Sequence, residues 1–202
     1  MMMPQRRIRS PFAPTAAIAG AIALVTLAGC GTPSPMHGVG VGEPLPAAPL
    51  LATRADGGRW ELAAEKGHFV LLYFGYTHCP DICPATLADW ARAKRALGKQ
   101  AVAVHFVFVS VDPERDTPAA ALAYARQFDT TFVGLAPTVA QLDAITQAWG
   151  IAAVKEPAGT DGSYGIAHPA QAFLLDREGR VKLMYPPGTN AADLASDLRQ
   201  LF

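Results

Sequence analysis

Apolar positions along the chain form short continuous runs that are separated by amphipathic segments. Residues 69–74 are apolar throughout and include Val, Phe and Tyr, which predicts a central strand buried on both faces. Residues 102–111 form a second run of strand character, and residues 131–135 form a shorter third one. Two further runs, 171–175 and 181–185, flank an Asp-Arg-Glu-Gly turn and predict a hairpin.

Helical signals fill the intervals between these strands. Apolar residues recur at helical spacing after the first strand, and Gly98 follows them as a suitable C-terminal residue. Thr117, Thr138 and Asn190 are each good N-cap residues ahead of a further apolar-periodic segment. We therefore expect helices over residues 84–97, 118–128, 139–149 and 191–202.

The order of these elements predicts the fold class. Asp56-Gly57-Gly58 is a turn signal between two short extended segments, which predicts a β-hairpin ahead of the main sheet. Residues 155–166 hold few apolar side chains and are expected to form a long loop. Strands that alternate with helices predict a partly parallel sheet covered by helices, and the closing hairpin adds an antiparallel edge. This is an α/β, thioredoxin-like arrangement with an N-terminal β-hairpin and an inserted helix and strand.

The first thirty residues are typical of an export signal. Three arginines precede an apolar run of 13 residues, 16–28, which is too short for an ordinary transmembrane helix. The run ends in Leu-Ala-Gly-Cys, which resembles a bacterial lipobox in which Cys30 becomes the lipidated first residue. A plain secretory signal, an uncleaved anchor and a twin-arginine signal remain as alternatives. We therefore expect the protein in the bacterial cell envelope, lipid-anchored to the membrane and facing the periplasm or the exterior.

The predicted domain organisation has three parts. Residues 1–29 form the signal peptide, residues 30–49 a Pro- and Gly-rich flexible tether, and residues 50–202 one domain. Met36 and His37 in the tether could touch a metal, although an incidental pair is the simpler interpretation.

Charge excludes one class of partner. Loss of residues 1–29 removes three arginines and no acids, so 14 basic and 17 acidic residues remain and the net charge is −3. No basic stripe is present, and nucleic-acid binding is therefore not expected.

If Cys30 is lipidated, Cys79 and Cys83 are the two remaining thiols. They lie where the first strand runs into the first helix, and a helix N-terminus favours a thiolate. Because a proline inside a regular helix is unfavourable, we expect a loose turn from Cys79 to Cys83 and a helix from about Pro84. Helical i,i+4 spacing places Cβ atoms about 5–6 Å apart, whereas a disulfide needs about 3.5–4.5 Å, so a Cys79–Cys83 disulfide should form and be reducible.

The cysteine pair has three interpretations: a structural disulfide, a redox-active pair, or two ligands of a metal. Soft sulfur ligands select Cu(I), zinc or iron–sulfur sites, and two sulfurs with one imidazole suit copper. The candidate imidazoles are His68, His78, His105 and His168. In the expected topology, the loop that enters the strand from residue 171 lies against the cysteine turn, which favours His168.

Two longer motifs extend the picture. They are Gly-Tyr-Thr-His-Cys-Pro-Asp-Ile-Cys-Pro over residues 75–84 and Ser-Val-Asp-Pro-Glu-Arg-Asp-Thr-Pro over residues 110–118, followed by His168 ahead of a Phe-Leu-Leu-Asp strand. From about residue 44 to the end, the chain resembles the SCO/SenC family. This resemblance implies a membrane-anchored, thioredoxin-fold copper chaperone outside the cytoplasm.

The resemblance also implies a site and partners. Cys79, Cys83 and His168 would bind copper as Cu(I) or Cu(II), and the protein would deliver it to the binuclear copper centre of cytochrome c oxidase subunit II. A periplasmic thiol reductant or copper donor would be a further partner. The alternative function is a thiol–disulfide oxidoreductase that reduces the cysteines of that or another target, with Cys79 as the nucleophile. We expect a metallochaperone rather than an enzyme.

The neighbours of the histidine depart from the family pattern. The family usually has Asp before the histidine and Ser or Thr after it, whereas this chain has Ala167 and Pro169. The change removes a carboxylate that could orient the imidazole. Pro169 stands where thioredoxins carry a cis-proline, so we predict a cis His168–Pro169 bond. Asp81 could tune the metal or favour the first helical turn, and Arg115 is the expected partner contact of the 112–118 loop.

Overall fold

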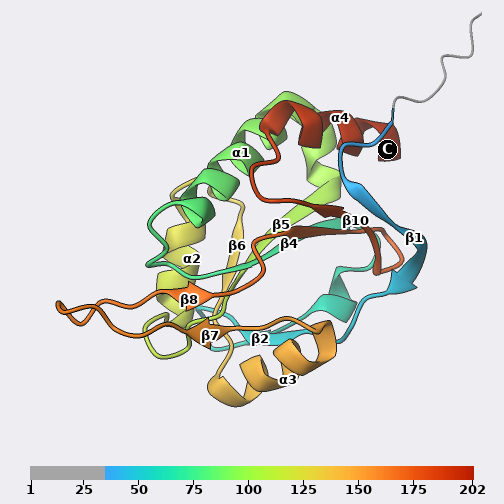
Figure 1. Cartoon of the computed structure of the whole chain (residues 1–202). Coiled ribbons are helices and arrows are strands. Elements are labelled where there is room, and N and C mark those ends of the chain that lie inside the picture. Colours follow the sequence, from blue (N-terminus) through green and yellow to red (C-terminus); the bar gives the residue numbers. More distant parts are fainter. Residues whose placement is uncertain (1–34) are drawn as a thin grey trace, which may run out of the picture. The chain divides into compact units, whose positions relative to one another are not determined.

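A computed structural model describes residues 35–202 and arranges them around one six-stranded sheet (Figure 1). The predicted signal peptide 1–29 and Cys30 lie outside the described residues. The strands, in spatial order, are β1 (Val39–Pro46), β10 (Arg180–Tyr185), β9 (Ala172–Leu175), β4 (Phe69–Gly75), β5 (Val104–Ser110) and β6 (Val133–Leu135). Strands β4, β5 and β6 run parallel, and β9, β10 and β1 add antiparallel pairs. The expected α/β arrangement is therefore confirmed.

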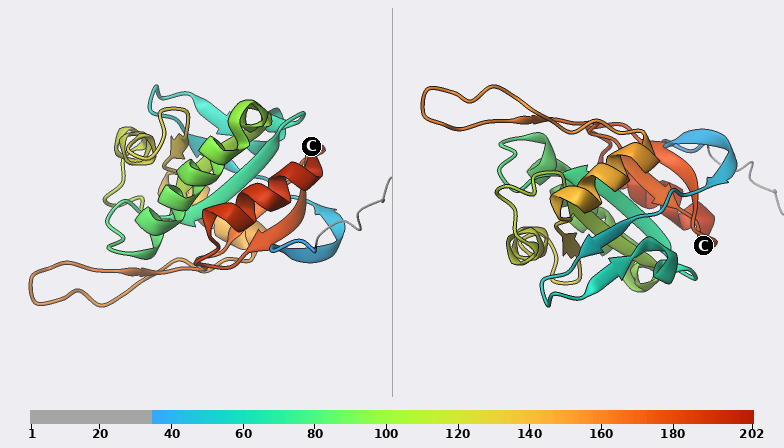
Figure 2. Two further views of the ribbon diagram at one scale, coloured as in Figure 1. Left: turned by 90° about the horizontal axis from the view of Figure 1, so that it is seen from above. Right: turned by 90° about the horizontal axis from the view of Figure 1, so that it is seen from below.

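Helices cover both faces of this sheet (Figure 2). Their bounds are α1 (Ile82–Leu97), α2 (Pro118–Arg126), α3 (Val139–Trp149) and α4 (Ala191–Leu201), with 3-10 helices η1 (Leu62–Glu65) and η2 (Gly98–Ala103). Helices α1 and α4 pack side by side and share one face with α2, whereas α3 covers the other face with the predicted hairpin of β2 (Leu51–Thr53) and β3 (Arg59–Glu61). None of the helices in residues 35–202 is long and apolar enough to cross a lipid bilayer.

Strand β4 is the centre of both hydrophobic cores. Its side chains are all buried, and they alternate between the two faces of the sheet. Leu71 and Tyr73 join the core beneath α1, while Leu72 and Phe74 join the core beneath α3. A strand that is apolar at every position suits this double burial. The burial fixes β4 firmly, and its carboxyl end is the point from which the cysteine loop starts.

Strand β1 lies within the segment that was predicted to be a flexible tether, so that prediction is partly wrong. Residues 39–46 were expected to be flexible, but they pair with β10 at the edge of the sheet. The register shifts between Gly40 and Leu45, and such an irregularity at a sheet edge tolerates the Pro and Gly residues that hid the strand from sequence analysis. The structured domain therefore starts before residue 50.

Two smaller differences concern element boundaries. The segment expected as a long loop, 155–166, begins and ends in a two-stranded ribbon of β7 (Val154–Lys155) and β8 (Ile166–Ala167). Residues 102 and 103, expected to begin the second strand, belong to η2 instead. The ribbon matters for function because His168 follows β8 directly.

His37 is a structural residue that anchors the start of β1. Its backbone N–H donates to Asp197 Oδ1 at 3.0 Å, and its ring Nδ1 lies 2.8 Å from the same oxygen. The Gly38 N–H donates to Asp197 Oδ2 at 2.8 Å, and Asp193 lies 3.3 Å from His37 Nε2. Asp197 belongs to α4 and its side chain is fully buried. His37 thus joins the edge strand to the last helix instead of serving an exposed tether.

This contact predicts that stability falls as pH rises through the titration of His37. The hydrogen bond that the His37 ring donates to Asp197 raises the pKa of His37 above its usual 6.5. The folded chain therefore holds this proton more tightly than the unfolded chain, and the contribution is complete below pH 6.5 and lost as pH rises through the folded pKa. Urea unfolding at about pH 5.5 and about pH 8.5 measures the loss. His37→Gln should lose less stability over this interval than the wild type; an equal loss would contradict the assignment.

Candidate functional site

The cysteine turn joins the carboxyl end of β4 to the first turn of α1. Cys79 lies in the connecting loop, and Cys83 is the second residue of the helix. The helix starts at Ile82, two residues earlier than expected, so the loose turn predicted from Cys79 to Cys83 ends at Asp81. Pro84 occupies the third helical position, where a backbone N–H would have no intrahelical acceptor and its absence costs little. Asp81 is the exposed N-cap residue, without a side-chain capping bond.

The two sulfurs have unequal environments. Cys83 is fully buried, and its Sγ lies 3.5 Å from the Tyr73 hydroxyl. Cys79 is half-buried, and its Sγ accepts a hydrogen bond from the Cys83 N–H at 3.5 Å. Both are free thiols in this structure. The pair therefore presents one accessible sulfur and one that is enclosed by the core.

Burial sets the protonation states of the site. It raises the pKa of the Cys83 thiol to about 12 and lowers the pKa of His168 below its usual 6.5. At neutral pH the site therefore holds a protonated Cys83 and a neutral imidazole. A neutral imidazole is ready to coordinate a metal, whereas Cys83 must first release its proton.

The structure brings His168 to the cysteine turn from the far end of the chain. The ring centroid of His168 lies 6.2 Å from that of Tyr73 and 5.8 Å from that of Tyr76. Tyr73 thus contacts both Cys83 and His168. Nδ1 of His168 donates to the Pro169 carbonyl oxygen at 3.0 Å, which leaves Nε2 with the lone pair that a metal needs. The topological argument that selected His168 over the other histidines agrees with this placement.

The ligand atoms of the three expected ligands lie farther apart than those of a closed metal site. Among residues 35–202, the group of three acidic, Cys or His side chains with ligand atoms all within 4.8 Å is His78, Asp112 and Asp116. Cys79, Cys83 and His168 do not meet this limit, so a metal would draw them together. Cys79 and His168 are the two half-buried members of the set, whereas Cys83 is fully buried.

The predicted cis His168–Pro169 bond is wrong. Every peptide bond among the described residues is trans, including this one. The trans form is favoured for X–Pro bonds by about 0.5–1 kcal/mol, and His168 makes its hydrogen bond to the Pro169 carbonyl in that form. Position in the fold was therefore not enough to infer the isomer.

The remaining candidate histidines lie elsewhere. His68 and His105 stack on each other at the amino ends of the parallel strands, with ring centroids 4.1 Å apart, and His105 also pairs with Glu65. His78 is exposed, and its Nδ1 lies 3.1 Å from Thr77 Oγ1 and 3.5 Å from Asp116. Its ring contacts the acidic loop after β5, as expected for a side chain that points away from its neighbour Cys79.

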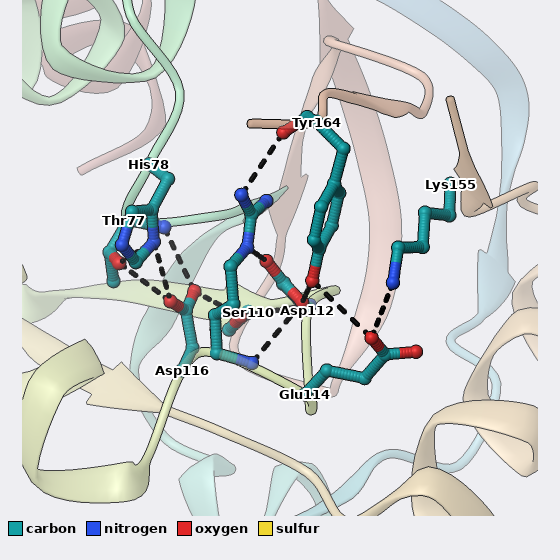
Figure 3. A network of polar contacts seen from close by, with 9 residues as sticks. Thr77, His78, Ser110, Asp112, Glu114, Asp116, Lys155 and Tyr164 are labelled. Carbon is teal, nitrogen blue, oxygen red and sulfur yellow. Dashed lines mark hydrogen bonds and ion pairs between the residues drawn. The ribbon is translucent and has the colours of Figure 1, made fainter. Parts of the chain in front are cut away.

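The loop after β5 forms a polar network that sequence analysis did not identify (Figure 3). Asp116 is buried and accepts hydrogen bonds from the Thr77 N–H at 2.8 Å, the Thr77 hydroxyl at 2.6 Å and the Ser110 hydroxyl at 2.6 Å. It thereby holds the backbone two residues before Cys79. Arg115, the residue expected to contact a partner, is half-buried and packs against Tyr164. The sequence signal for this network was the lone aromatic residue in the polar segment 155–165.

Comparison with known proteins gives the family. The SCO1/SenC family model matches residues 47–202, which is most of the chain. The chain belongs to the SCO1/SenC family. The chain is 32% identical over 137 residues to the mitochondrial SCO2 homologue of Bos taurus, covering 67% of this chain and 52% of that protein. It spans about half the length of the curated relatives that it matches.

Two solved structures of SCO1/SenC relatives bear on the chemistry. The structure of Bradyrhizobium japonicum ScoI, described with copper bound, is 36% identical, covers 78% of this chain and 99% of that one, and has a TM-score of 0.70. BsSco, a Sco-family cytochrome c oxidase assembly protein in which a disulfide switch was identified, is 25% identical, with 79% and 95% coverage and a TM-score of 0.60. The thioredoxin-like fold of this SCO1/SenC chain is thereby confirmed.

Proposed function

We propose that this protein binds one copper ion through Cys79, Cys83 and His168 and delivers it to the binuclear copper centre of cytochrome c oxidase subunit II. The observation that carries the proposal is the contact of Tyr73 with both Cys83 and His168, which places a distant imidazole beside the cysteine turn. The copper-bound Bradyrhizobium relative and the assembly role of BsSco support the metal and the pathway.

The donor set suits copper better than its common competitors. Two thiolates and one imidazole form a soft, three-coordinate set, and soft donors select Cu(I). A structural zinc site takes four ligands, and no other cysteine is available among the described residues. Cys79 offers an accessible sulfur for capture and release, whereas Cys83 offers an enclosed one that retains the ion.

The cellular location belongs to the same proposal. The apolar run 16–28 and Cys30 support a lipid anchor in the bacterial cell envelope, with the domain facing the periplasm or the exterior. A copper donor or a thiol reductant in that compartment would load or reduce the site.

A copper titration tests this function. The reduced protein should saturate at one equivalent of copper, and the oxidised protein, with its cysteines joined, should bind none. His168→Ala should weaken binding measurably, and His105→Ala is the matched control because His105 lies at the other end of the strands. Absence of binding, or equal binding by His168→Ala and the wild type, would refute the proposal.

The buried thiol predicts that copper affinity rises with pH. Burial raises the pKa of Cys83 to about 12, so its thiol is protonated throughout the neutral range and must release a proton on binding. Each released proton strengthens apparent binding about tenfold per pH unit. Competition titrations at about pH 7, 8 and 9 measure the slope, above the range in which His168 itself takes up a proton. An affinity independent of pH would contradict a role for Cys83 as a ligand.

The unequal exposure of the two thiols favours one second function, a thiol–disulfide oxidoreductase. The accessible Cys79 thiolate would attack a target disulfide and form a mixed disulfide, with one target thiolate as the leaving group. Cys83 would then displace the second target sulfur, which leaves a Cys79–Cys83 disulfide and a reduced target. A thiol reductant would restore the pair.

A trapping experiment separates this function from copper delivery. Cys83→Ser should accumulate the mixed disulfide with a thiol-reactive disulfide probe, whereas Cys79→Ser should not react. Equal reaction of the two variants would exclude the proposed order of attack.

A further inference from the structure

Three segments that are far apart in sequence meet in the polar network beside the cysteine turn (Figure 3). The loop after β4 contributes Thr77, the loop after β5 contributes Asp112 and Arg115, and the β7–β8 ribbon contributes Tyr164. The Tyr164 hydroxyl donates to Asp112 Oδ1 at 3.1 Å. The ribbon is thereby tied to the same loop that holds the residues before Cys79.

Arg115 is the central member of this contact. Its guanidinium lies 3.4 Å from the centroid of the Tyr164 ring, and its Nη1 donates to the Tyr164 carbonyl oxygen at 3.1 Å. Its Nε donates to Asp112. Nη2 is buried and has no hydrogen-bond partner among the described residues, so stacking and the other two nitrogens hold the group. A planar guanidinium makes all these contacts at once, which an ammonium cannot do.

Two short structural connections link the contact between Arg115 and Tyr164 to His168. Tyr164 lies two residues before β8, and His168 follows β8 directly. The ribbon is internally paired, since the Glu156 N–H donates to the Gly165 carbonyl oxygen at 2.9 Å. On the other route, the Tyr76 ring lies 5.8 Å from the Arg115 guanidinium and 5.8 Å from the His168 ring. Displacement of Tyr164 would therefore free the segment that carries His168.

We propose that Arg115 and Tyr164 form a latch that positions His168 against the cysteine turn. The inference rests on the proposed copper function for its consequence, but not for its geometry. The latch fixes the ribbon, and the ribbon limits His168 to the short movement that closes the copper site. Arg115 and Tyr164 are positioning residues, because neither is a ligand of the expected metal. Partners that orient a metal ligand change metal affinity by about 10–100-fold when they are removed.

The first experiment uses the reduced, metal-free protein, so its outcome does not depend on copper. Nuclear magnetic resonance relaxation of the His168 ring should report a mobile side chain in Arg115→Gln and in Tyr164→Leu. Tyr164 is only partly buried where it packs against the core, and leucine keeps an apolar side chain there, so Tyr164→Leu keeps the test valid if Arg115→Gln does not fold. Thr160→Ala is the matched control, because Thr160 is exposed in the turn of the same ribbon. A His168 ring as ordered in both latch variants as in Thr160→Ala would overturn the inference.

The second experiment asks whether the latch acts through His168. Copper affinity should fall about 10–100-fold in Arg115→Gln and Tyr164→Leu, and by less than about fivefold in Thr160→Ala. In the His168→Ala background, Arg115→Gln should cause little further loss, because the two residues act as one unit. A full additional loss in that background would overturn the latch. A wild type that binds no copper would refute the proposed function, while the relaxation experiment would still decide the latch.

Discussion

Replacing Cys83 by serine should abolish tight copper binding and leave the fold intact. The substitution exchanges a soft sulfur for a hard hydroxyl oxygen, which Cu(I) does not favour. The site would keep only Cys79 and His168. We expect affinity to fall by more than about 100-fold, beyond the range seen for residues that merely orient a ligand. Competition with a copper chelator of known affinity measures the change.

The fold should survive because serine fits the same enclosure. Cys83 contacts the Tyr73 hydroxyl at 3.5 Å, and a serine hydroxyl can hydrogen-bond with that group. Circular dichroism and a urea unfolding curve serve as controls. Thr86→Ser, on the same helix, is a matched conservative change outside the expected ligand set. Copper affinity within tenfold of the wild type in Cys83→Ser would contradict the proposed site.

Gly75→Ala should lower both stability and copper affinity. A methyl group at Gly75 would lie 2.8 Å from Phe108 Cε2, 2.9 Å from Cys83 Sγ and 2.9 Å from Tyr73 Cε1. These neighbours are fully buried in a close-packed core, so they have little room to yield. Overpacking of this kind lowers the free energy of unfolding by about 1–3 kcal/mol. The displaced Cys83 sulfur should also bind copper more weakly.

A second glycine provides the control for this prediction. Gly40 lies on the exposed edge strand β1, and a methyl group there would meet no atom within 4 Å. Gly40→Ala should change the free energy of unfolding by less than about 0.5 kcal/mol. Urea unfolding and copper competition of the two variants give the comparison. A Gly75→Ala protein as stable as Gly40→Ala would show that the cysteine turn is less tightly packed than the structure indicates.

The sequence predicted the elements that rest on local patterns. The apolar run of β4, the N-caps Thr138 and Asn190, and the turn between β9 and β10 each carry their signal within a few residues. Strand β1 was missed because it is held by backbone pairing with β10 and by the contact of His37 with Asp197, 160 positions away. Neither contact leaves a local pattern.

For the candidate site too, the sequence predicted the parts that rest on local spacing and on topology. The cysteine spacing is local, and the choice of His168 followed from the topology, since the strand after it had to lie beside β4. The contact of Arg115 with Tyr164 joins residues 49 positions apart, and its one sequence signal is that Tyr164 is the lone aromatic residue of a polar segment. The His168–Pro169 bond is trans, so the position of this proline in the fold did not determine its isomer.

X-ray absorption spectroscopy of the reduced protein with one equivalent of copper tests the central claim most directly. The spectrum reports the atoms bound to the metal, and the proposal predicts two sulfurs and one imidazole nitrogen. His168→Ala should lose the imidazole signal and keep both sulfurs, because Cys79 and Cys83 remain. A spectrum with two sulfurs and no imidazole in the wild type, or an imidazole signal that persists in His168→Ala, would contradict the assignment of Cys79, Cys83 and His168 as the copper ligands.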